Sequence, residues 1–240
     1  MELTADGSGV RIKGYTGKIA AVKIPAVIEG LPVREIGDRA FDDNWTITSV
    51  VMPAGLVKIG EGAFHNCSRL ASVTIPDSIT EIRKDMFRGC SGLTSVKIPN
   101  SVTRIGSSAF RGSGITALTL GTGITAIPAF FAANCSALKT VVIPEGVTEI
   151  QEGAFYGCTA LTNVTLPSTI TKIEYGAFRL CPALSTVIIP GSVEAIEFPP
   201  CRAEEERFSD KPSCAFAGCP KLGIAAQAAL KKRGYTGGFN

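Results

Sequence analysis

The chain has 240 residues, of which 45% are hydrophobic and 19% charged, and its mean hydropathy is +0.25. Such a chain can bury a substantial core, and we expect one continuous body rather than two globular domains. The net charge is only +3, with 24 basic and 21 acidic side chains spread along the chain, so no basic stripe is available for phosphates and a nucleic-acid partner is not expected.

The first residues and the hydropathy profile bear on location. Residues 1–18 are polar and glycine-rich, unlike a signal peptide, and no later stretch has the roughly 18 apolar residues that a membrane span needs. We therefore expect a soluble chain with no membrane span. The sequence leaves two locations open: the cytoplasm, or export with a signal peptide that is not part of this chain.

From residue 21 onward the sequence repeats the template L-x-x-V-x-I-P-x-x-V/I-T-x-I-x-x-x-A-F-x-x-C. The first unit is longer and the last one is interrupted; between Val50 and Val187 successive units are 23 residues apart, with one step of 22. The V-x-I segment alternates as a strand does, and the proline after it ends the strand because it lacks an N–H. The valine position is occupied by Val50, Val73, Val96, Leu118, Val141, Val164 and Val187, and the phenylalanine position by Phe41, Phe64, Phe87, Phe110, Phe155, Phe178 and Phe216.

A unit this short cannot bury its apolar side chains alone, so the units must stack with like residues on like. The predicted fold is an α/β repeat solenoid, mostly β, with one short parallel strand per unit and short helical turns. We expect a single domain over 1–240, with an N-terminal cap at 1–20, about eight repeats at 21–222 and an insertion near 197–213. Residues 223–240 are predicted to form a C-terminal helical cap and tail, because Ile224 to Arg233 is alanine-rich, basic in its last turn and followed by Gly234.

Two departures from the template stand out in the middle of the chain. In the fifth unit Phe130 and Phe131 precede the expected phenylalanine position, which holds Ala132, and this unit is one residue short further upstream. Ser113 takes the place of the repeat cysteine.

A charged position supports the stacking. The residue before the second isoleucine of each unit mostly alternates in sign, so neighbouring units place opposite charges side by side and a slipped register would bring like charges together. We interpret this position as register control: Glu35, Lys58, Glu81, Arg104, Ala126, Glu149, Lys172, Ala195.

The cysteines and the single histidine give no catalytic or metal pattern. Six cysteines lie at the repeat position and are expected to be small buried apolar residues: Cys67, Cys90, Cys135, Cys158, Cys181 and Cys219. Cys201 and Cys214 lie outside the repeat, where they would form a disulfide in an exported protein and stay free thiols in the cytosol. His65 follows Phe64 at a position that we expect to be exposed and tolerant. We therefore expect no enzyme activity, no cofactor and no metal.

The motif I-P-x-S-V-T-x-I-G-x-x-A-F, as it stands from Ile98 to Phe110, resembles the BspA-type leucine-rich repeats. This resemblance covers about residues 17–222 and implies a curved right-handed horseshoe without catalytic activity. It also implies a bacterial surface or secreted adhesin that binds host extracellular matrix or plasma proteins. Two alternatives stay open: an intracellular scaffold for protein–protein interactions in the cytoplasm, and a structural surface-layer subunit.

Because valine and isoleucine point inward, the alternate strand residues point outward onto the strand-lined concave face. This face is the candidate ligand-binding surface, since exposed aliphatic side chains on a flat sheet indicate recognition. Lys23 and Lys97 would favour acidic partners at one end, and we expect a monomer that binds a protein ligand. The alternative is that β-branched residues stand there because they suit strands. The predicted binding residues are Lys23, Val51, Thr74, Lys97, Thr119, Val142, Thr165 and Ile188.

Overall fold

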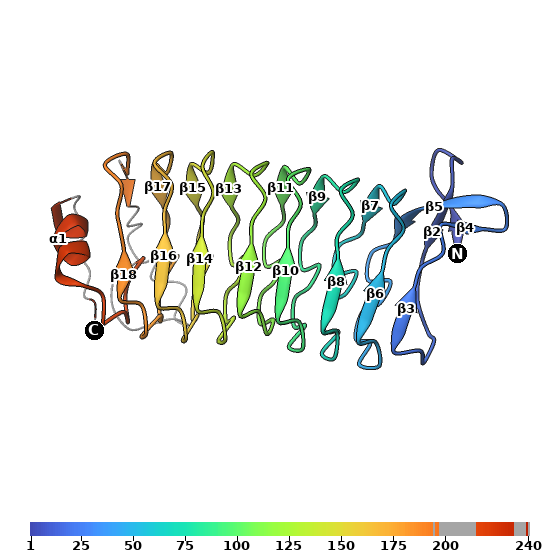
Figure 1. Cartoon of the computed structure of the whole chain (residues 1–240), viewed down its shortest axis with the longest axis horizontal. Coiled ribbons are helices and arrows are strands. Elements are labelled where there is room, and N and C mark those ends of the chain that lie inside the picture. The colour runs from blue at the N-terminus through green and yellow to red at the C-terminus, as the bar shows by residue number, and fades with distance from the viewer. Residues whose placement is uncertain (194, 197–214, 233–238, 240) are drawn as a thin grey trace, which may run out of the picture.

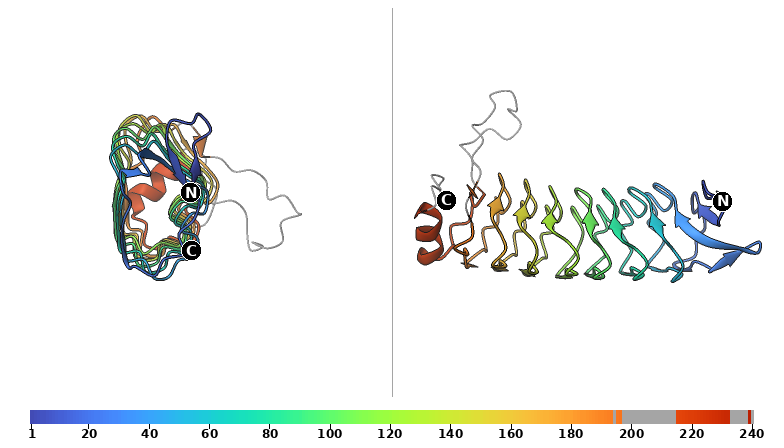
Figure 2. Two further views of the ribbon diagram at one scale, coloured as in Figure 1. Left: turned by 90° about the vertical axis from the view of Figure 1, so that its right-hand side faces the viewer. Right: turned by 90° about the horizontal axis from the view of Figure 1, so that it is seen from above.

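The computed structural model describes residues 1–193, 195–196, 215–232 and 239. The chain forms a mostly β parallel solenoid whose turns follow one another along a single, slightly bent axis (Figure 1). Viewed along that axis, the turns superpose on one another (Figure 2). The repeat period therefore predicts the fold class correctly. The expected short helical pieces are hydrogen-bonded turns instead, and helix is confined to α1 among the described residues.

Short strands at the predicted valine positions form the first of two rows. Because the units are equivalent, most neighbouring strands of this row pair in parallel with like residues opposite like, for example Val22 with Val50 and Val50 with Val73. The first row consists of β3 (Ala21–Lys23), β6 (Ser49–Val51), β8 (Ser72–Thr74), β10 (Ser95–Lys97), β12 (Ala117–Thr119), β14 (Thr140–Val142), β16 (Asn163–Thr165) and β18 (Thr186–Val187).

A second row of strands lies at the charged position of each unit. In the numbering of Figure 1 it consists of β5 (Leu31–Ile36), β7 (Lys58–Ile59), β9 (Glu81–Ile82), β11 (Arg104–Ile105), β13 (Ala126–Ile127), β15 (Glu149–Ile150), β17 (Lys172–Ile173) and β19 (Ala195–Ile196).

The predicted charge pairs face each other in this second row. Glu35 pairs with Lys58, Glu81 with Arg104 and Glu149 with Lys172 across parallel strands. The Lys172 ammonium lies 3.0 Å from the Glu149 carboxylate, and the Arg104 guanidinium 3.8 Å from that of Glu81. The expected opposition of charges is thus confirmed for these pairs.

Turns that carry the phenylalanines form the remaining side of the solenoid, and they are joined by backbone hydrogen bonds such as Phe41 N to Ala63 O, 2.8 Å. The predicted phenylalanines are all buried, and five neighbouring pairs of rings stack at 4.9–5.6 Å between centroids. Each buried ring contributes about 1.5–3 kcal/mol, which makes this column a major source of stability.

The fifth unit differs from the expectation in an informative way. The column contains an eighth ring, that of Phe131, which is fully buried and meets Phe110 and Phe155 edge-on at 84° and 86°. The backbone of Phe131 occupies the position of the alanine that precedes the phenylalanine in the repeat. Phe110 N donates to Phe131 O, just as Phe87 N donates to Ala109 O in the unit before. The backbone register therefore does place Ala132 at the phenylalanine position, as the sequence indicates. The side chain of the preceding residue fills the space and turns its ring by about a right angle.

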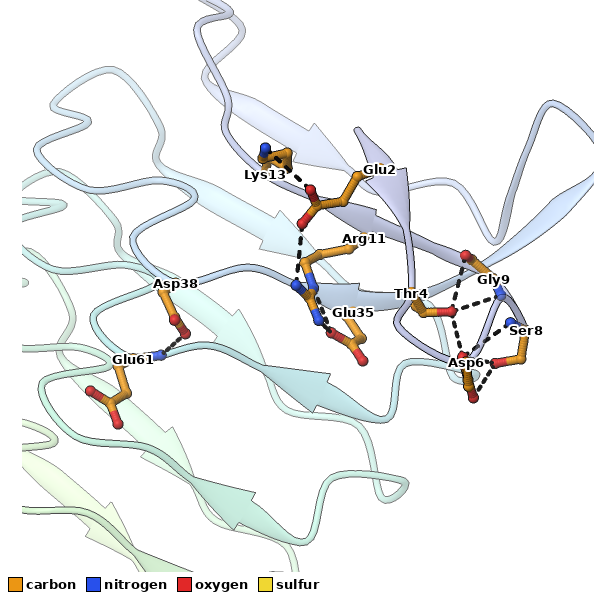
Figure 3. A network of polar contacts seen from close by, with 10 residues as sticks. All are labelled: Glu2, Thr4, Asp6, Ser8, Gly9, Arg11, Lys13, Glu35, Asp38 and Glu61. Carbon is orange, nitrogen blue, oxygen red and sulfur yellow. Dashed lines mark hydrogen bonds and ion pairs between the residues drawn. The ribbon is translucent and has the colours of Figure 1, made fainter.

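The N-terminal residues close one end of the solenoid. β1 (Glu2–Leu3) and β2 (Val10–Ile12) pair antiparallel, β2 then pairs in parallel with β5, and β4 (Val27–Ile28) forms a hairpin with β5. Arg11 donates to the Glu35 carboxylate at 2.6 Å, which extends the charge alternation by one step (Figure 3). The Tyr15 ring stands 5.3 Å from that of Phe41 and ends the aromatic column.

The other end carries α1 (Ile224–Lys232), which lies within the segment that the sequence predicts to be helical (Figure 1). Its residues Ala226 and Leu230 are buried and belong to the hydrophobic core, and Lys231 and Lys232 lie in its last turn. The predicted insertion and its two cysteines, Cys201 and Cys214, lie outside the described residues.

Candidate protein-binding surface

The outward side chains of the first row define a surface that we call the strand face. All eight predicted binding residues lie on it and are exposed. Their inward neighbours are buried, except for the half-buried Val22 and Val73. The aliphatic members have exposed fractions of 54% for Val51, 62% for Val142 and 77% for Ile188. These three side chains remain largely exposed after folding. A large favourable free energy from burying them can therefore come only from contact with another molecule.

Four hydroxyl groups at the edge of the strand face already have partners. The side-chain hydroxyls of Thr48, Thr116, Thr162 and Ser185 donate to backbone carbonyls of the preceding unit at 3.1–3.3 Å. These side chains therefore strengthen the contact between units. The central column of the strand face, which is exposed along its whole length, consists of aliphatic residues, threonines and lysines.

The first row is not continuous. β8 pairs with β6, and β10 pairs with β12, but β8 and β10 do not pair with each other although they are neighbours. A second interruption separates β12 from β14. The row is thus divided into three blocks, whereas the aromatic column behind it continues without a break.

A shallow cleft of about 640 Å³ lies at the first interruption. Val73, which lines the cleft, is half-buried, whereas its counterparts Val50 and Val96 are buried. Two predicted binding residues, Thr74 and Lys97, belong to its wall. The cleft is lined by Met52, Ala54, Val73, Thr74, Ile75, Pro76, Asp77, Ser78, Lys97 and Pro99.

The lining of the cleft combines apolar residues with two charged groups of opposite sign. Lys97 and Asp77 both line it, and among the described residues neither forms an ion pair. An apolar lining with a few polar groups is the usual composition of a recognition pocket. The sequence gives no sign of the cleft, because the step from Val73 to Val96 is the regular 23 residues.

The repeat cysteines are small buried residues, as predicted. All six are buried free thiols, and each donates to a backbone carbonyl of the preceding unit at 3.0–3.2 Å. The pKa of Cys90 is raised by its contact with the Cys67 thiol and by burial, and burial raises that of Cys135. Thiols with raised pKa values are poor nucleophiles and poor metal ligands.

His65 does not match its expected exposed position. Its side chain is only 20% exposed, and its Nδ1 lies 2.7 Å from the Asp42 carboxylate of the first unit. Both residues directly follow the phenylalanine of their units, so stacking brings them together. Aligning the repeats by this position, rather than examining His65 alone, could have revealed the pair.

A family model described as "BspA type Leucine rich repeat region" matches residues 16–139 and 125–198. Among solved structures, a leucine-rich repeat protein from Bacteroides ovatus is 30% identical over 80% of this chain, with a TM-score of 0.76. This chain spans about half, 52%, of that protein's length. A T. pallidum leucine-rich repeat protein is also 30% identical, covers 99% of this chain with 94% of its own length, and has a TM-score of 0.68.

A leucine-rich repeat protein from Eubacterium ventriosum, 22% identical with a TM-score of 0.52 over 79% of this chain and 48% of its own, shares the fold. No curated protein matches this chain. Within the described residues, no helix is long and apolar enough to cross a membrane.

Proposed function

Because the chain belongs to the BspA-type leucine-rich repeat family, whose role is protein binding without catalysis, we propose that it is a bacterial surface adhesin that binds host matrix or plasma proteins through the strand face. The observation that carries this proposal is the exposure of Val51, Val142 and Ile188 on a face that no other described element covers. Aliphatic groups spaced along such a face suit a folded protein partner better than a small ligand.

The cleft between β8 and β10 supports a preferred point of contact. An aliphatic or aromatic side chain of the partner would pack against its apolar residues, as the central anchors of protein interfaces do. Lys97 beside it, and Lys23 at the N-terminal end of the same column, would attract carboxylates of the partner. The proposed partner surface is therefore apolar at its centre and acidic at its edge.

The test is binding of the protein to a panel of purified host matrix and plasma proteins, measured by surface plasmon resonance. The variant V51D/V142D/I188D places three carboxylates on the strand face, and we expect each to weaken binding by about ten-fold or more, or 1.4 kcal/mol. A matched control, V57D/T80D/T125D, adds three carboxylates at exposed positions beside the second row. It should bind as the unchanged protein does.

Equal loss of binding in both variants, or in neither, would overturn the strand face as the site. Lack of binding to any host protein would instead refute the adhesin role. In that case, saturable binding of a purified protein from the source organism that is lost in V51D/V142D/I188D would favour the scaffold function.

A further inference from the structure

We propose that Asp42, Asp43 and His65 form a binding site for a divalent transition-metal ion. Each side chain offers one ligand atom, and these three atoms all lie within 4.8 Å of one another. The site lies among the turns of the aromatic column at the N-terminal end of the solenoid. It is separate from the strand face and does not depend on the proposed adhesin function.

The backbone fixes the spacing of the three side chains. Asp42 and His65 occupy equivalent positions in adjacent units, and Asp43 N donates to the His65 carbonyl at 2.9 Å. One step earlier, Phe41 N donates to the Ala63 carbonyl at 2.8 Å. Two hydrogen-bonded turns thus hold the ligands in place before any ion arrives, which is the arrangement that an effective metal site requires.

The surroundings contain further carboxylates, and the site is accessible. Asp38 lies in the same turn, and its carboxylate accepts the backbone N–H of Glu61, another acidic residue (Figure 3). Each carboxylate of the proposed site already has a partner: Arg39 donates to Oδ2 of Asp42 at 3.0 Å, His65 Nδ1 lies 2.7 Å from Oδ1 of Asp42, and the Asn66 side-chain amide donates to Oδ1 of Asp43 at 2.9 Å. An ion would bind through the remaining lone pairs of these carboxylate oxygens. Asp43 is exposed, so an ion can reach the site from solvent.

The donor set indicates which ions fit. One imidazole nitrogen and two carboxylate oxygens suit Zn²⁺, Mn²⁺ or Co²⁺, whereas Ca²⁺ takes oxygen ligands only. Three protein ligands leave at least one coordination position open to water. The equivalent position in later units holds Arg88, Arg111, Ala133, Tyr156, Arg179 or Ala217, so among the described units this combination occurs once.

The experiment is titration of untagged C201S/C214S protein with Zn²⁺ by isothermal calorimetry, so that neither a purification tag nor the two cysteines outside the repeat contributes. We expect one ion per chain. The variants D43N and H65Q should each bind Zn²⁺ at least about ten-fold more weakly. A control variant, D85N, removes a carboxylate from the next turn and should leave the affinity unchanged.

Two further readouts identify the ligands directly. His65 is the only histidine, so Zn²⁺ should shift one assignable set of imidazole signals in the NMR spectrum. Co²⁺ should give the visible absorption of a nitrogen and oxygen site in the parent protein and lose it in D43N, whose thermal unfolding without metal should be unchanged because Asp43 is exposed. Absence of one-to-one binding, or equal affinity of the parent, D43N and H65Q proteins, would overturn the proposal.

Discussion

Phe131 of the fifth unit, which fills the phenylalanine column from the preceding backbone position, allows a direct test of how the column stabilises the solenoid. Phe131 is 0% exposed, and its ring contacts those of Phe110 and Phe155 at 5.4 and 6.1 Å between centroids. Phe131→Ala removes the ring and leaves a cavity in the middle of the column. We expect the free energy of unfolding to fall by about 3–5 kcal/mol.

The sharper test is the double variant F131A/A132F, which restores the order of residues found in most other units. Ala132 already has the backbone position of a column phenylalanine, since its N–H donates to Ala154 O as that of Phe155 donates to Ala177 O. A ring carried by position 132 should therefore enter the column from the usual side. The double variant should recover most of the lost stability and unfold within about 1.5 kcal/mol of the unchanged protein, because the buried volume is conserved.

Urea unfolding followed by far-ultraviolet circular dichroism measures both variants. A loss below about 1 kcal/mol for F131A would show that the neighbouring turns close over the space and that the column is not a major stabilising element. A double variant no more stable than F131A would refute the assignment of Ala132 to the phenylalanine position.

Three other predictions follow from the polar and thiol groups. In C201S/C214S protein, the six repeat thiols should react with a disulfide reagent only after unfolding in guanidinium chloride, and fast reaction of the native protein would contradict their burial. Hydrogen bonds from Thr4 and Ser8 lower the pKa of Asp6 from 3.8 to about 2. The ionised Asp6 carboxylate therefore stabilises the fold fully above pH 3.8, and this contribution is lost as the pH falls towards 2. Urea unfolding at each pH should show that the unfolding free energy falls less steeply over this range in D6N than in the unchanged protein. Glu149→Gln should reduce the unfolding free energy by about 0.5–1 kcal/mol at low salt, and a loss equally large in about 1 M salt would argue against the ion pair with Lys172.

The sequence predicts the core of this protein well because stacking makes every unit a copy of its neighbour. Once the spacing of 23 residues identifies equivalent positions, one strand and one phenylalanine specify all the others. The one-residue deletion in the fifth unit does not disturb this. β10 and β12 still pair with Val96 opposite Leu118, so the missing residue is absorbed within the loop between them.

Features that depend on how two particular units meet are harder to predict. The ring of Phe131 enters the column from the neighbouring backbone position, and a positional template cannot show this because it assigns one side chain to each place. The cleft beside Val73 arises where strands of regular spacing fail to pair. Strand pairing responds to displacements far smaller than one residue, and the order of residues does not record such displacements.

The contact between Asp42 and His65, unlike the cleft and the ring of Phe131, could have been predicted from the sequence. The same comparison that reveals the alternation of Glu149 and Lys172 would place a carboxylate beside an imidazole at the position after the phenylalanine. In a solenoid, a residue's neighbours are its equivalents in the adjacent units more than its neighbours along the chain. Function should therefore be sought where a column departs from its own pattern. The first-row interruption beside Lys97 and the acid–imidazole pair at the N-terminal end are two such departures, and each can be tested without disturbing the other.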